Sequence, residues 1–176
     1  MSVIGTHAFW HVQRTPRIAR LIVLNNALLF ACVSMYFGTG WSLVLFSFPI
    51  EPQLTPDNYY LQFVPQVTAA TQFFTYMTSL MLVLALIMSV AEWGRPLRWL
   101  PVVVMLAIIA PTLLTTSIIL PLNAELARGI TDPAELKDIL GRWMVLNEVR
   151  VSMWTVQWLC MIAYFAIKAL PSEEAA

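Results

Sequence analysis

Residues 69–90 read AATQFFTYMTSLMLVLALIMSV, a run of side chains without a single charge. An α-helix needs about 20 apolar residues to cross the hydrocarbon core of a bilayer, because no backbone polar group can stay unpaired there. This run therefore predicts a membrane-spanning helix. Further apolar stretches meet the same criterion at residues 21–48, 100–122 and 151–169.

The composition of the whole chain agrees with four spans. Of the 176 residues, 59% are hydrophobic and 11% are charged, and the mean hydropathy is +0.72. Soluble domains carry about 25% charged residues. We therefore predict an all-α, four-transmembrane-helix bundle that forms a single domain over residues 1–176. The formal net charge of zero argues against a nucleic-acid partner, and membrane lipid is the expected surrounding.

Basic residues in the short connections predict the orientation. The residues concerned are Arg14, Arg17, Arg20, Arg95 and Arg98. The loop after the first span carries Glu51 and Asp57 and no base. Cytoplasmic loops carry an excess of Lys and Arg. We therefore expect both termini in the cytoplasm, a cytoplasmic amphipathic segment at residues 1–20, and a multi-pass protein of the cell inner (plasma) membrane.

The connection before the last span contains a strong helix start. In Asp132-Pro133-Ala134-Glu135, an acid stands at the N-cap, proline at the first helical position and Glu at the third. No proline follows until Pro171. The fourth helix is therefore predicted to begin near Asp132 and to extend outside the membrane before its apolar part begins.

This helix carries a stripe of polar and aromatic side chains. At 100° per residue, six side chains lie within about 80° of one another: Trp143, Asn147, Arg150, Trp154, Trp158 and Met161. An arginine at the membrane boundary is costly unless it faces the bundle. One interpretation is a pocket for a carbonyl, phenolate or carboxylate. The other is an interfacial arginine paired with lipid phosphate or with an acid, for which the candidates are Glu51, Glu125 and Glu148.

The third span contains proline and hydroxyl side chains. Pro111 predicts an interruption, and Pro121 predicts the end of the helix or a kink. Asn123 would then satisfy freed carbonyls together with Arg150, or cap the helix terminus. The hydroxyls at positions 112, 115, 116 and 117 are expected to bond to their own helix or to a neighbour.

Few residues suggest a metal or redox site. His7 and His11 have the i, i+4 spacing of a shared metal, but no third ligand is near in sequence, so we expect no metal. Cys32 and Cys160 lie in apolar runs and are expected to be buried apolar groups or, alternatively, a bridge between helices. No motif identifies a cofactor. The apparent lack of a buried charge or repeat argues against a transporter or pump.

Two segments of the chain resemble a known family. They are Pro121-x-Asn123 followed by Leu126, and Trp143-x-x-x-Asn147-x-x-Arg150; the first span adds Gly40, Ser42 and Pro49. The pattern resembles the anthrone oxygenase-like family of small four-helix membrane proteins, whose characterised members oxidise anthrones to anthraquinones with dioxygen.

The resemblance implies roles for five residues. Arg150 and Asn147 would be catalytic and hold the enolate or phenolate oxygen of the substrate. Trp143, Trp154 and Asn123 would bind the substrate, with the indoles stacked on its ring. The base would be Glu125, Glu148 or the substrate's own acidity.

Two functions are therefore predicted. The first is a small membrane oxygenase or oxidase that binds an aromatic or quinone-like ligand in a polar pocket at the outer end of the bundle, alone or as a homo-oligomer. The alternative is a non-catalytic accessory subunit of a larger membrane enzyme complex that helps to place lipid, quinone or pigment.

Overall fold

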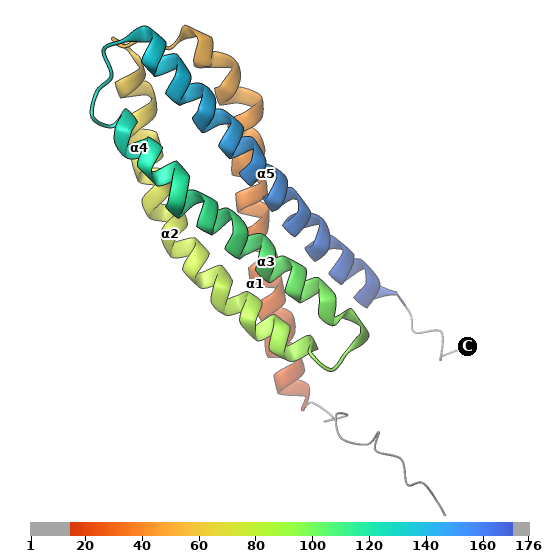
Figure 1. Ribbon diagram of the computed structural model, residues 1–176. Helices are drawn as coiled ribbons and strands as arrows, with labels where there is room; N and C mark the ends of the chain where they lie inside the picture. Colours follow the sequence, from red (N-terminus) through yellow and green to blue (C-terminus); the bar gives the residue numbers. More distant parts are fainter. Residues whose placement is uncertain (1–14, 171–176) are drawn as a thin grey trace, which may run out of the picture.

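The computed structural model describes residues 15–170, which form four long helices (Figure 1). All four are long and apolar enough to cross a membrane. The chain begins with α1 (Pro16–Ser42), which continues into a π-helical turn, η1 (Leu43–Ser47), and a 3-10 turn, η2 (Phe48–Gln53). The second helix is α2 (Tyr59–Glu92). A short turn, η3 (Pro96–Arg98), leads into the third.

The third span is built from three consecutive helical pieces. They are α3 (Trp99–Leu114), a second π-helical turn η4 (Thr115–Ile119), and α4 (Leu120–Leu126). The last helix is α5 (Pro133–Ala169). Over the described residues the predicted all-α bundle is confirmed, with α1 packed on α2 and α5, and α3 packed on the same two helices.

The predicted start of the last helix is confirmed. The Asp132 side chain accepts a hydrogen bond of 2.9 Å from the Ala134 N–H, and Pro133 occupies the first turn. The early part of α5 packs on α4 and the start of α2 through a second apolar cluster that contains Tyr59, Leu126 and Leu136. The Tyr59 hydroxyl donates a 2.9 Å bond to the Leu126 carbonyl and holds these segments together.

Neither proline of the third span ends its helix, so the predicted interruption at Pro111 and the predicted helix end at Pro121 were wrong. The helix continues through Pro111 to Leu114, and it continues past Pro121 to Leu126. Pro121 lies in the first turn of α4, directly after a π-helical turn, where a missing N–H costs little. The helix that contains the predicted second span, α2, begins at Tyr59, and residues 16–20, the described end of the predicted amphipathic segment, belong to α1.

The structure brings the described residues of the predicted cytoplasmic segments to one end of the bundle, where α1 begins and α5 ends (Figure 1). We call this the basic end. Its described charged residues are Arg17, Arg20, Glu92, Arg95, Arg98 and Lys168. Five bases against one acid give a charge of +4. Trp93 and Trp99 are about two-thirds exposed there, as interfacial indoles would be.

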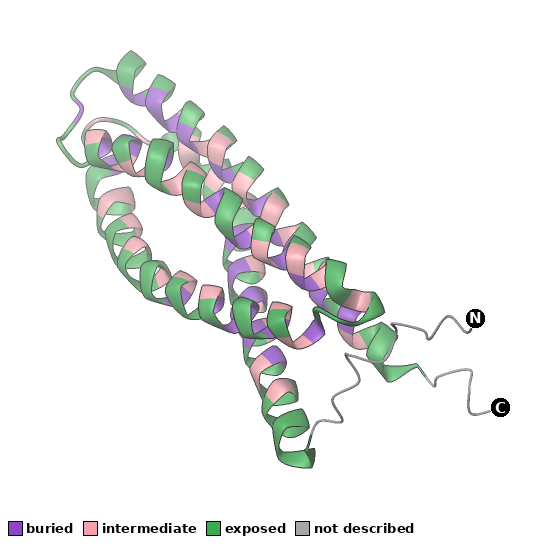
Figure 2. Cartoon of the chain, turned by 60° about the horizontal axis from the view of Figure 1, so that its bottom comes forward, coloured by how far each residue is buried: buried purple, intermediate pink, exposed green. Residues whose placement is uncertain are grey.

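The outer surface of the bundle is apolar. Figure 2 shows buried residues on the inward faces of the helices and exposed residues on their outward faces. Many exposed side chains in the spans are aliphatic; examples are Leu21, Val83, Val90 and Leu106. An apolar exterior of this extent fits hydrocarbon better than water. We therefore conclude that the chain is a multi-pass membrane protein.

Candidate functional site

A cavity of about 480 Å³ lies between the four long helices. We call it the Arg150 pocket. Its walls come from α1, α2, the third span and α5, and they include Arg150, Trp154, Trp143 and Asn123. Four of the five predicted site residues therefore line one cavity. Its volume is within the range of about 300–1,000 Å³ that holds small-molecule ligands.

Arg150 contributes the positive charge in this pocket. Its Nη1 donates to Thr115 Oγ1 at 3.2 Å, its Nη2 donates to Asn147 Oδ1, and the guanidinium lies 4.7 Å from the centre of the Trp154 ring. Its Nε–H is buried without a hydrogen-bond partner. Among residues 15–170, no acid forms an ion pair with Arg150. The predicted pairing with Glu51, Glu125 or Glu148 is therefore wrong.

The π-helical turn η4 positions the contact from the third span. Its first residue, Thr115, donates its hydroxyl to the Pro111 carbonyl at 2.7 Å, which leaves the oxygen free to accept from Arg150. Single π turns inside helices are frequent at functional sites. Thr112 and Thr116 also donate to carbonyls of their own helix, as predicted.

Asn147 lies behind the pocket rather than in its wall. It is fully buried, and its Nδ2 donates to the Trp143 carbonyl at 2.7 Å while its Oδ1 accepts from Arg150. One N–H of its amide group is used in this way. Asn147 orients the guanidinium and does not line the pocket, so its predicted contact with a substrate oxygen stays a prediction.

Trp143 and Asn123 join α5 to the third span. Trp143 Nε1 donates to Asn123 Oδ1 at 2.8 Å, and Asn123 lies inside α4 rather than at a helix terminus. The Trp143 ring lies edge-on to Phe63 at 4.7 Å and to Phe48 at 5.9 Å. Its position is therefore fixed by contacts with α2 and η2 as well as by its hydrogen bond.

Sequence reasoning missed the α1 wall of the pocket. A Cβ atom at Gly40 would come within 2.8 Å of Trp154 Cε3 and of Val151 Cγ2, so glycine lets α5 approach this closely. Tyr36, one helical turn earlier, donates to the Phe74 carbonyl at 2.9 Å, and its ring is edge-on to Trp154 at 4.8 Å. The i, i+4 spacing of Tyr36 and Gly40 puts both residues on one face of the first span, which is a weak sequence indication of this wall.

The pocket offers no carboxylate for proton transfer. Among the described residues that line it, Arg150 is the one ionised at neutral pH, and the rest are apolar, hydroxyl or amide side chains. Glu125 and Glu148, the predicted bases, are not in its wall, and Glu148 is exposed. Of the three alternatives predicted for removal of the substrate proton, the acidity of the substrate itself is the one that needs no residue of the wall.

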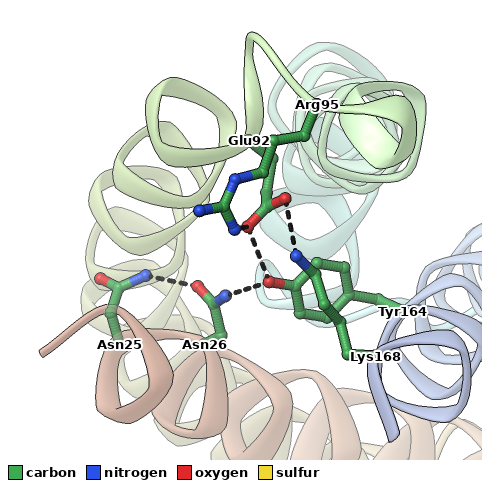
Figure 3. Close-up of polar contacts among 6 residues, drawn as sticks. All are labelled: Asn25, Asn26, Glu92, Arg95, Tyr164 and Lys168. Atoms are coloured by element: carbon green, nitrogen blue, oxygen red, sulfur yellow. Dashed lines mark hydrogen bonds and ion pairs between the residues drawn. The ribbon is translucent and has the colours of Figure 1, made fainter. Parts of the chain in front are cut away.

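A second polar cluster lies at the basic end and was not predicted (Figure 3). Glu92 is 1% exposed, and its Oε1 accepts from Arg95 at 3.3 Å and from the Tyr164 hydroxyl at 3.1 Å. Its Oε2 accepts from Lys168 at 3.1 Å. Asn26 donates to the Tyr164 oxygen at 2.9 Å. We call these residues the Glu92 cluster. It corrects the expectation that the bundle holds no buried charge.

The remaining sequence candidates take no part in either cluster. Cys32 and Cys160 are unbridged, so the alternative of a bond between helices is wrong. Over residues 15–170, no group of three or more potential ligands could hold a metal ion. His7 and His11 lie outside the described residues.

Comparison of the chain with protein-family models, curated proteins and solved structures finds no match. The resemblance to the anthrone oxygenase-like family therefore stays a prediction.

Proposed function

We propose that this protein is a small oxygenase-like protein of the plasma membrane that binds an aromatic or quinone-like compound in the Arg150 pocket. One observation carries the proposal. A partly buried guanidinium, whose Nε–H is buried without a hydrogen-bond partner, has no acid partner among the described residues and faces a cavity that all four long helices line. A charge in this position is costly in a membrane protein unless it has a functional partner. The partner that fits is the anionic or carbonyl oxygen of a ligand.

The aromatic part of the ligand has matching walls. Trp154 and Trp143 line the pocket on α5, and Phe74 lines it on α2. Flat aromatic rings pack favourably against such side chains. A ring placed here with its oxygen at Arg150 would have one charged contact and otherwise apolar, hydroxyl or amide surroundings.

The chemistry of an anthrone substrate fits this arrangement. Loss of a proton from the ring CH₂ group gives an enolate, whose negative oxygen Arg150 would stabilise. Because no carboxylate lines the described pocket, the proton would pass to water. The enolate carbon then reacts with dioxygen, and overall CH₂ and O₂ become C=O and H₂O. A pre-positioned cation lowers the cost of the anion, which is the main role we assign to the protein.

Oxygen uptake by the purified protein with anthrone as substrate tests the proposal. Uptake above the spontaneous rate should fall by about 10²–10³-fold in Arg150→Gln, the range seen when an oxyanion donor is removed. Arg142→Gln is the matched control, because Arg142 is an exposed arginine on the same helix outside the pocket. Equal uptake by a folded Arg150→Gln variant and the wild type would remove Arg150 from the reaction.

A non-catalytic accessory subunit is the second candidate, favoured by the absence of a carboxylate among the described residues that line the pocket. Such a subunit would hold a quinone or pigment without turning it over. Native mass spectrometry after mild extraction distinguishes the two. A fixed assembly with other proteins, together with no oxygen uptake above background, would favour the subunit.

A further inference from the structure

A groove of about 660 Å³ lies at the basic end, separate from the Arg150 pocket. It runs between the start of α1, the end of α2 and the end of α5. One part of its wall is apolar and includes Ile22, Val23 and Phe165. The other part is the Glu92 cluster. The groove therefore offers hydrocarbon contact and charge side by side.

The charged part of the groove has an excess of positive charge. One carboxylate, Glu92, is shared by two cations, Arg95 and Lys168, which gives a balance of +1. The Glu92 side chain is 1% exposed, whereas those of Arg95 and Lys168 are 44% and 34% exposed. The acid thus lies beneath the two cations, and the cations form the accessible surface.

Both cations have donors to spare. An ammonium group carries three N–H donors and a guanidinium carries five. Each uses one in its contact with Glu92. Because Glu92 already accepts bonds from Arg95, Tyr164 and Lys168, it holds both cations in place without neutralising them fully. This is the arrangement expected for binding a second, external anion.

We propose that this groove binds an anionic phospholipid, with its phosphate on Arg95 and Lys168 and an acyl chain along Ile22, Val23 and Phe165. Val23 is 63% exposed, so the apolar wall is continuous with the lipid-facing surface. Basic pockets between transmembrane helices on the cytoplasmic side are known to bind anionic headgroups. The charge of +4 at this end attracts such lipids, and the apolar wall favours a lipid over free phosphate.

Native mass spectrometry of the full chain, taken up from vesicles of defined composition, tests this site. In a mixture of equal parts phosphatidylglycerol and phosphatidylcholine, we expect the wild type to retain phosphatidylglycerol at least fivefold over phosphatidylcholine. The double variant Arg95→Gln/Lys168→Gln should lose this preference. Arg20→Gln/Arg98→Gln is the matched control, since it removes the same charge at the same end from residues outside the groove wall. It should keep the preference.

Two results would overturn the proposal. One is equal retention of the two lipids by the wild type, and the other is an unchanged preference in the groove double variant.

Inorganic phosphate is tested separately, because its ability to displace the retained phosphatidylglycerol would assign the site to free phosphate. If the double variant does not fold, Arg95→Gln alone is used, since it keeps the ion pair between Lys168 and Glu92. It should lower the preference severalfold, and an unchanged ratio would contradict the site.

Discussion

The two polar centres of this bundle both include residues of α5, and each holds a charge between the helices with a different set of partners. Arg150 in the pocket and Lys168 at the basic end are both on α5, about 27 Å apart along its axis at 1.5 Å per residue. That separation is close to the thickness of the hydrocarbon core, about 30 Å. Each centre thus lies near one boundary of the predicted span.

The difference lies in how each charge is compensated. Glu92 has two cations and a tyrosine hydroxyl as partners, so its charge is balanced within the protein. Arg150 has a threonine, an asparagine and an indole face, which are all neutral. Ion pairs and hydrogen bonds in the Glu92 cluster join α1, α2 and α5. At Arg150 the charge has no acid partner among the described residues, and we propose that a ligand balances it.

Removal of Glu92 should have the largest effect on stability. Glu92→Ala leaves the buried Tyr164 hydroxyl and two cations without their acceptor, and we expect a loss of ~2–4 kcal/mol in the free energy of unfolding. This is less than the cost for a fully buried pair because Arg95 and Lys168 are partly solvated. Denaturant titration in detergent measures it, with exposed Glu148→Ala as control. Equal stability of Glu92→Ala and the wild type would show that this centre does not hold the bundle together.

Closer packing at the pocket should have a smaller effect. Gly40→Ala places a Cβ about 2.8 Å from Trp154 Cε3 and Val151 Cγ2, so the indole has to move. Overpacking of this kind costs ~1–3 kcal/mol. Because Trp154 lies against the Arg150 guanidinium, the variant should also lower oxygen uptake.

Gly38→Ala is the matched control for this change, since a Cβ at Gly38 meets nothing within 4 Å. It should melt at or slightly above the wild-type temperature, because alanine favours the helix. A Gly40→Ala variant that behaves like Gly38→Ala would show that the close approach of α1 and α5 is unimportant.

Loss of the hydrogen bond between α5 and α4 should have the smallest effect. Trp143→Phe removes the 2.8 Å bond to Asn123 Oδ1 and keeps an aromatic ring beside Phe63. Hydrogen bonds in membrane proteins contribute about 0.6 kcal/mol on average, so we expect a loss of ~0.5–1.5 kcal/mol. Exposed Trp93→Phe is the control. A loss equal to that of Glu92→Ala would mean that this single hydrogen bond contributes as much to stability as the Glu92 cluster, which would contradict the ranking.

The sequence predicts the local features of this molecule well. Four spans follow from hydropathy, the start of α5 follows from Asp132 and Pro133, and the inward stripe on α5 follows from helical periodicity. Each depends on residues that are neighbours along one helix. The sequence does not predict which helices face one another.

The missed features all depend on contacts between helices. Gly40 matters because Trp154 lies against it, and Glu92 is buried because Tyr164 and Lys168 reach it from α5. The error at Pro121 has another origin. A π-helical turn precedes it and lets the helix continue, and such a turn has no reliable sequence signal.

Arg150 lacks an acid partner among residues 15–170, and we propose that it therefore selects an anionic ligand. The most direct test compares the affinities of two ligands of similar size, 2-hydroxy-1,4-naphthoquinone, which is an anion at neutral pH, and neutral 1,4-naphthoquinone. Quenching of tryptophan fluorescence reports binding, because Trp143 and Trp154 line the pocket.

A hydrogen bond to a charged group contributes about 1.5–3 kcal/mol. We therefore expect the wild type to bind the anion about 10–100-fold more tightly than the neutral quinone. Arg150→Gln should bind the two about equally while remaining folded. Equal affinities in the wild type, or an anion preference that survives in Arg150→Gln, would contradict the account.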